Sequence, residues 1–187
     1  MKKLFLIVGA SGSGKSYLEF RLVENYGLSK VVSLTTRQPR KNEVHGKDYF
    51  FVSQEEFDSA EKIESVVFSG NSYGVPVSEI ENKKTNIVLV VEPEGLKQIL
   101  KWCSTQKNYK PYVIFFSFPE NLRSRLMEQR GDSKEDISKR LWNDRVFNKN
   151  FWETGIKPDV IIDSIIEDVD DYVMKKLNYI KININVC

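Results

Sequence analysis

Hydrophobic residues gather along this chain in short, mostly apolar runs, with polar and helical segments between them. The runs lie at residues 4–8, 31–33, 87–91, 113–118 and 160–162. Runs without polar alternation are typical of strands that are covered on both faces of a parallel sheet. The segment after the first run has Leu18, Leu22 and Val23 on one helical face. The alternation of strand and helix predicts an α/β fold, with a parallel sheet and helices on both faces.

Turn and capping residues mark the expected helix ends. The first helix should end near Asn25, before a Tyr-Gly pair. Pro93 suits the first turn of the next helix, and Pro119 opens another, which Gly131 ends.

The last third of the chain predicts two more helices and a tail. Ser133 lies three residues before Asp136, a spacing typical of a helix start, and a long helix is expected to reach about Phe151. A final helix is expected at residues 168–177. Apolar residues then alternate with polar ones over residues 180–186, which fits an edge strand or a disordered end.

Residues 34–85 break the regular alternation and predict a small insertion of short elements. Residues 34–48 are basic without a period, and a strand is expected at 49–52. Ser53 and Glu56 form a capping-box pattern that opens a short helix through about residue 60. Two short strands follow, at 64–68 and 71–75, and Ser78 is the expected cap of a helix at 79–83. No linker composition marks the edges of this segment.

Composition narrows the function classes. The chain has 187 residues, enough for one well-buried domain, and its formal net charge is only +2. This balance points to neither nucleic acid nor membrane as a partner. His45 is the only histidine, which argues against His-based metal sites and Ser-His-Asp triads. Cys103 and Cys187 fit no Cys-x-x-Cys pattern and are typical of a reduced, cytoplasmic protein. The N-terminal apolar run is too short for a secretory signal and has no cleavage site after it.

The stretch from Gly9 to Ser16 carries the clearest chemistry. It satisfies G-x-x-x-x-G-K-[ST], directly after an expected strand and directly before an expected helix, which indicates a phosphate-binding P-loop. Backbone N–H groups and the helix N-terminus would surround an anion, Lys15 would reach the β- and γ-phosphates, and the Ser16 hydroxyl would hold magnesium. The expected ATP-binding residues are Ala10, Ser11, Gly12, Ser13, Gly14, Lys15, Ser16 and Tyr17. The alternative is an ordinary glycine-rich turn.

Further motifs, taken with the P-loop, make the chain resemble the guanylate kinase family. They are Ser33-Leu34-Thr35-Thr36-Arg37-Gln38-Pro39-Arg40, then Glu43, Gly46, Asp48 and Tyr49, then Ser69-Gly70-Asn71, Tyr73-Gly74, Arg125-Leu126, Arg130-Gly131, Arg140-Leu141 and Glu153-Thr154-Gly155. The resemblance covers about residues 1–163. It implies a P-loop NTPase-type parallel-sheet core (1–33, 86–130 and 152–187), a nucleoside-monophosphate-binding α+β insertion (34–85) and a mobile lid (131–151), all in one domain. It also implies transfer of a phosphoryl group from ATP to GMP or dGMP, with Mg2+, by a cytoplasmic monomer or homodimer.

The same resemblance assigns roles to individual residues. Arg37, Arg40, Tyr49 and Tyr73 would hold the monophosphate. Arg130 and Arg140, with Lys15 and Arg37, would be catalytic. Glu64 would accept hydrogen bonds from guanine, assisted by the Ser33 hydroxyl, and Val75 and Glu92 would lie near the base. Apart from the resemblance, Glu64 could equally be an exposed carboxylate on a strand.

The sequence departs from the family pattern near the base, which keeps the alternatives open. Val75 stands where a hydroxyl residue is usual, Glu92 and Val90 replace aspartates, Asn42 replaces a glycine, and Asp163 replaces an asparagine. A lost hydrogen bond to a neutral partner weakens binding by about 0.5–1.5 kcal/mol. A related monophosphate kinase of altered or relaxed base specificity is therefore one alternative. A non-catalytic binding module is the other, and the intact P-loop lysine argues against it.

Overall fold

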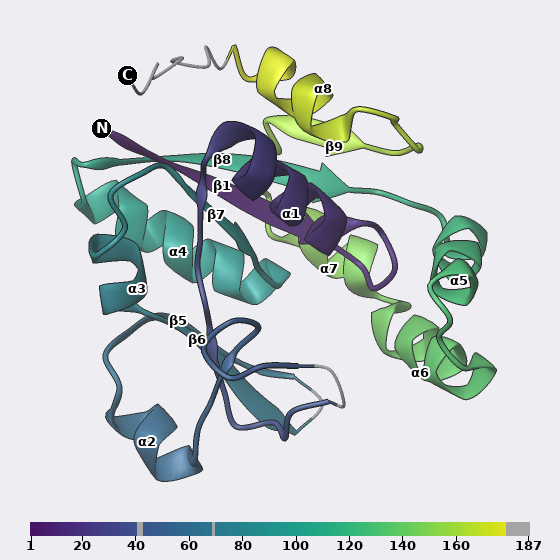
Figure 1. Ribbon diagram of the computed structural model, residues 1–187, viewed down its shortest axis with the longest axis horizontal. Coiled ribbons are helices and arrows are strands. Elements are labelled where there is room, and N and C mark those ends of the chain that lie inside the picture. Colours follow the sequence, from purple (N-terminus) through teal and green to yellow (C-terminus); the bar gives the residue numbers. More distant parts are fainter. Residues whose placement is uncertain (41–42, 69, 179–187) are drawn as a thin grey trace.

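The computed structural model describes residues 1–40, 43–68 and 70–178, and its elements are arranged around two sheets (Figure 1). The first sheet is five-stranded, with the order β2-β7-β1-β8-β9 and only parallel pairings. Its strands are β2 (Ser29–Lys30), β7 (Ile87–Val90), β1 (Lys2–Gly9), β8 (Tyr109–Phe116) and β9 (Val160–Ile162). The predicted α/β fold with a parallel sheet is confirmed.

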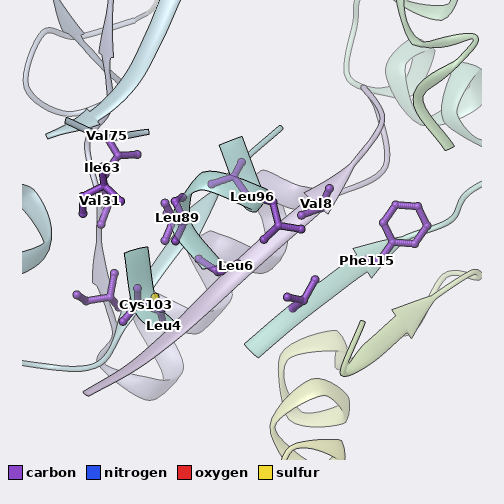
Figure 2. Packing of buried hydrophobic residues seen from close by; sticks show 14 of the residues in the cluster. Leu4, Leu6, Val8, Val31, Ile63, Val75, Leu89, Leu96, Cys103 and Phe115 are labelled. Atoms are coloured by element: carbon purple, nitrogen blue, oxygen red, sulfur yellow. The ribbon is translucent and has the colours of Figure 1, made fainter. Parts of the chain in front are cut away.

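Helices cover both faces of this sheet because its strands are apolar on both sides. Leu4, Leu6 and Val8 of β1 pack with residues of α4 (Pro93–Thr105) and α7 (Phe147–Glu153), and Figure 2 shows part of this core. Phe5 and Ile7 point to the opposite face and pack with α1 (Lys15–Tyr26) and α8 (Val169–Lys176). All five of these β1 side chains are fully buried.

A second, four-stranded sheet has the order β4-β3-β6-β5 and lies apart from the first (Figure 1). Its strands are β4 (Phe50–Phe51), β3 (Leu34–Thr35), β6 (Asn71–Pro76) and β5 (Lys62–Phe68), with α2 (Gln54–Ser59) before β5 and α3 (Val77–Glu81) after β6. All of these elements come from the segment expected as an insertion. The boundaries of that insertion and of the lid stay predictions.

Two further helices, α5 (Glu120–Gln129) and α6 (Lys134–Asp144), follow the carboxyl end of β8. In Figure 1 they stand beyond the P-loop end of the first sheet. They therefore lie where the loops after the parallel strands meet, which is the usual place for a ligand in such sheets.

Several expected helix ends are confirmed. Ser53 and Glu56 form a complete capping box at α2, and Ser133 accepts a hydrogen bond from the backbone N–H of Asp136 at the start of α6. Pro93 occupies the first turn of α4. The first helix ends at Tyr26, and the capping residue after it, Gly27, adopts φ +64°.

The segment between the two sheets was predicted incorrectly. The expected strand at 31–33 pairs two residues earlier, as β2, and β3 begins inside the segment expected to be a loop. The reason is that the chain leaves the first sheet here: the N–H of Val31 still donates to the Val88 carbonyl, but that of Val32 donates to the Glu79 carboxylate at 3.0 Å. Ser78 is not a cap, because α3 begins at Val77 without a side-chain cap.

The long helix expected from Ser133 to Phe151 is in fact two helices, α6 and α7. Val146 interrupts them with φ −105° and ψ 3°. The interruption turns the chain so that Phe147 and Phe151 enter the core, where the Phe151 ring stacks on Phe115 at 3.9 Å. The strand expected from the alternating pattern at residues 180–186 lies outside the described residues.

Candidate functional site

The loop between β1 and α1 has the backbone that an anion-binding loop requires. Gly12 and Gly14 adopt φ +77° and +92°, which L-residues with side chains rarely adopt. A Cβ atom on Gly12 would also lie 2.9 Å from the Arg123 carbonyl oxygen. These glycines let the loop curl directly in front of the N-terminus of α1, where N–H groups and the helix dipole favour an anion.

Lys15, the first residue of α1, lies over this loop. Its Nζ donates a hydrogen bond to the Ala10 carbonyl at 2.9 Å. Burial lowers the pKa of Lys15, and the carboxylates of Glu92 and Asp144 partly oppose that shift. A desolvated ammonium held by one neutral carbonyl is ready to exchange that partner for a phosphate oxygen.

A cavity of about 650 Å³ opens beside the loop and joins it to the second sheet. Most of the sequence-predicted site residues line it: Ser11, Gly12, Ser13, Gly14, Lys15, Ser16 and Tyr17; Ser33, Arg40, Tyr49, Glu64, Tyr73 and Glu92; and Arg130 and Arg140. Ala10, Arg37 and Val75 are not among the described residues that line it. The fold thus brings the P-loop, the second sheet and the segment around α5 and α6 to one space.

Arg37 does not line the cavity but contacts Tyr49, which does. One of its terminal nitrogens donates to the Glu43 carboxylate at 2.8 Å and the other to the Gln38 carbonyl at 2.7 Å. Its guanidinium stacks over the Tyr49 ring, with 5.5 Å to the ring centroid. Burial lowers the pKa of Arg37, but the hydrogen bond and charge of Glu43 outweigh it, so that the pKa is raised.

The same cluster contains two tyrosines in contact, and burial keeps Tyr49 neutral. Tyr49 and Tyr73 pack edge to face, 5.9 Å apart. Burial raises the pKa of Tyr49 to about 12, so its hydroxyl stays a hydrogen-bond donor. With Arg40, whose side chain is 59% exposed, this cluster offers donors and positive charge to an anion.

Glu64 is a buried carboxylate at the inner end of the cavity. It is 7% exposed, and burial, with a smaller contribution from the Glu92 charge, raises its pKa to about 7. Gly95 of α4 gives it room, because a Cβ there would lie 2.6 Å from its Oε2. Val75 is paired with Glu64 across the sheet and is 1% exposed. The interpretation of Glu64 as an exposed carboxylate is wrong.

The charge of Glu92 acts on two other groups of the cavity, Glu64 and Lys15. It is the residue before α4, and its side chain does not cap the helix. Burial raises the pKa of Glu92, and the charge of Lys15 partly opposes that shift. The cavity therefore holds two carboxyl groups with raised pKa values, and one of them, Glu92, interacts with Lys15.

Two arginines face the cavity from the segment around α6 and share one carboxylate. Arg130 donates to Asp132 through Nε at 3.0 Å and through a second nitrogen, and the Nε of Arg140 lies 3.9 Å from the same carboxylate. The hydrogen bond and charge of Arg130 lower the pKa of Asp132, although burial opposes them. Sequence reasoning did not single out Asp132.

Sequence reasoning also missed a buried ion pair beneath the P-loop. Arg123 of α5 and Asp144 of α6 are 5% and 6% exposed, and both bond the backbone of Ser11. The available signal was that Arg123 lies four residues before Met127, on the buried face of its helix. Nothing in the sequence pairs it with a residue 21 positions later.

The cavity has an apolar end, which was also not predicted. Its lining there consists of Phe116, Phe118, Leu126, Met127, Ile162, Ile165, Ile166 and Val169. A space with phosphate-binding backbone at its centre and an apolar wall beside it suits a nucleotide, whose base is flat and largely apolar.

The described part of the chain contains no cluster of side chains that could hold a metal ion by itself. There, no group of three or more His, Cys, Asp or Glu side chains is arranged around a common point.

The helices of residues 1–40, 43–68 and 70–178 are all too short or too polar to cross a membrane.

Comparisons with known proteins agree with the resemblance. The family model described as "Guanylate kinase" matches residues 1–177. A guanylate kinase of Malacoplasma penetrans is 36% identical over 156 residues, which cover 74% of this chain and 75% of that protein. One from Mycoplasma mycoides is 39% identical over 152 residues, and these cover 74% of this chain but only 49%, about half, of that longer relative. The crystal structure of guanylate kinase from Anaplasma phagocytophilum matches the fold with a TM-score of 0.65 at 24% identity, covering 98% of this chain and 88% of the other.

Proposed function

The chain belongs to the guanylate kinase family, and from that premise we propose that it transfers a phosphoryl group from ATP to GMP or dGMP, forming GDP or dGDP and ADP. One observation carries the proposal. A single cavity is lined by the P-loop lysine, by the buried carboxylate Glu64 and by two arginines, Arg130 and Arg140. Donor, acceptor and charge-neutralising groups would therefore meet in one place.

The acceptor would bind at the second sheet. An ionised Glu64 accepts hydrogen bonds from N1–H and the exocyclic amine of guanine, whereas adenine presents an unprotonated N1 that repels a carboxylate. Ser33 offers a hydroxyl on the same wall. Arg40, Tyr49 and Tyr73 would hold the phosphate, and Arg37 would support them through its stacking on Tyr49.

The donor would bind at the P-loop, with its base against the apolar wall. The residues present suit a magnesium nucleotide, because the Ser16 hydroxyl supplies the hard oxygen donor that Mg2+ prefers and the nucleotide phosphates supply the others. Magnesium held there would neutralise charge on those phosphates. Lys15 would leave the Ala10 carbonyl for a phosphate oxygen.

Transfer itself needs little chemistry from side chains. The acceptor is already a phosphate with a free oxygen, so alignment and charge neutralisation supply most of the rate. Arg130 and Arg140 would exchange the shared Asp132 carboxylate for the transferring phosphoryl group. We propose that residues 34–85 and 131–151 close over the two nucleotides and exclude water.

A parallel assay of monophosphates tests this function. ADP release is followed with MgATP against GMP, dGMP, AMP, CMP and UMP. We expect turnover with GMP and dGMP and at least tenfold lower kcat/KM with the others. Activity on another base would mean that Val75 and Glu92 have changed the base pocket. Turnover with none of them would contradict the kinase assignment and leave a binding module.

The raised pKa of Glu64 predicts that GMP binding depends on pH near neutrality. Because only the carboxylate accepts both guanine hydrogen bonds, and its pKa is about 7, the ionised fraction falls as the pH is lowered through 7. We expect the KM for GMP to rise about tenfold from pH 8 to pH 6. The Glu64→Gln variant is the control, because it keeps the shape but cannot titrate. Since the phosphate of GMP titrates in both proteins, equal profiles would contradict the role of Glu64.

A further inference from the structure

The backbone of Ser11 in the P-loop is held by a buried ion pair from two other helices. Its N–H donates to Asp144 Oδ2 at 2.6 Å, and its carbonyl accepts from an Arg123 terminal nitrogen at 3.1 Å. The same arginine nitrogen lies 3.4 Å from Asp144 Oδ2. The side chains of Arg123 and Asp144 are only 6% and 5% exposed. Both backbone polar groups of this one residue are thus bound, the N–H by a carboxylate and the carbonyl by a guanidinium.

The Arg123–Asp144 pair is better explained as a device that positions the P-loop than as one that stabilises the fold. Desolvating two charges offsets most of their attraction, so a buried pair adds little net stability compared with apolar residues of the same size. Removing one partner, however, leaves an unpaired buried charge. The backbone of α5 also lies directly against the loop, since its Arg123 carbonyl leaves no room for a side chain at Gly12. Residues of α5 and α6 therefore hold the loop from outside its phosphate-binding surface.

Asp144 is the last residue of α6, and Arg140 lies one helical turn before it. Residues four apart share a helix face, about 6 Å apart along the axis. The bond from Asp144 to Ser11 therefore fixes this end of α6 against the P-loop, one turn from the arginine that lines the cavity. The other end of α6 follows residues 131–133, of which Gly131 and Ser133 are exposed. A movement of α6 would pivot about the Asp144 end.

We propose that Asp144, held by Arg123, is a positioning residue that anchors α6 to the P-loop and thereby places the Arg140 guanidinium for the phosphoryl group bound there. This inference rests on the proposed function, because the rate of transfer is what the anchor sets. Asp144 itself is buried beneath the loop and is not among the described residues that line the cavity. It acts through Arg140.

A double-mutant cycle between Asp144 and Arg140 tests the proposal. For Asp144→Ala, we expect kcat to fall about thirtyfold, within the hundredfold that a 1 Å misplacement can produce, and the KM for GMP to change less than threefold. In an Arg140→Ala background the same substitution should lower kcat less than threefold, because the misplaced group is already gone. Asp144→Asn keeps an oxygen for the Ser11 N–H and should lose less than the alanine variant.

The controls separate this role from folding and from the function itself. Lys139→Ala, an exposed neighbour on α6, should leave kcat unchanged. Thermal unfolding identifies any variant that fails to fold, and the cycle is then run with Asp144→Asn. If the losses multiply in the double variant, Asp144 does not act through Arg140 and the proposal is wrong while the kinase function stands. An inactive wild-type protein would instead overturn the proposed function, and this inference with it.

Discussion

Replacing Lys15 by alanine is expected to lower kcat for transfer from ATP to GMP by at least about a thousandfold, because the lysine would neutralise charge on the phosphates bound at the P-loop. Its ammonium lies over the loop, held only by the Ala10 carbonyl among the bonds that the structure shows for it. GMP would bind at the second sheet, away from this group. We therefore expect its dissociation constant to change less than twofold. The measurements are ADP release under saturating substrates and calorimetric titration with GMP.

The stability of this variant provides an independent check. Burial lowers the pKa of Lys15, which means that the fold does not favour the charged form at this position. Removing it should leave the melting temperature unchanged or raise it, and that result would show that lost turnover is not a folding defect. Lys15→Arg keeps the charge but not the compact ammonium, and should recover only part of the rate. Lys149→Ala, whose side chain is 73% exposed on α7, is the matched control. Full activity of Lys15→Ala would show that ATP does not bind at this loop.

The core of the fold could be predicted because its signals are local. The strand before Gly9, the turn glycines and the helix after Lys15 follow one another in the sequence, and the Ser53–Glu56 capping box spans four residues. The element boundaries that were predicted incorrectly depend on contacts between residues far apart in the sequence. The chain leaves the first sheet at Val32 because Glu79, 47 residues away, binds its N–H. The helix expected to reach Phe151 breaks at Val146 so that two phenylalanines can enter the core.

The candidate site likewise has residues that local sequence patterns predict and residues that only the structure reveals. The P-loop and the arginine and tyrosine motifs were found as contiguous patterns, and most of these residues line one cavity. Arg37 is outside that lining, and its guanidinium is bound by Glu43 and stacked on Tyr49. Arg123 and Asp144 gave no joint signal, because an arginine and an aspartate on separate helices usually face water. Only the three-dimensional structure brings them together at Ser11.

Replacing Arg130 is also expected to cause a large loss of turnover. It follows α5, its side chain is 54% exposed, and it shares the Asp132 carboxylate with Arg140. A phosphoryl group in transfer offers more negative charge than that carboxylate and would draw the arginines from it. Arginines in this role contribute about 10³–10⁵ to the rate of phosphoryl transfer. We expect Arg130→Ala to lower kcat about a thousandfold and to change the KM for GMP less than threefold.

Single-turnover kinetics are the measurement for Arg130, because product release or opening of the site limits kcat in many kinases and would hide part of the effect. Arg130→Lys should recover about tenfold of the lost rate, since it restores charge but not the planar fork that matches phosphate oxygens. Lys134→Ala, an exposed lysine in the first turn of α6, serves as the control for charge alone. A raised KM with an unchanged single-turnover rate would assign Arg130 to ground-state binding. A lowered rate at constant KM requires that the arginine meets charge that exists only in the transition state.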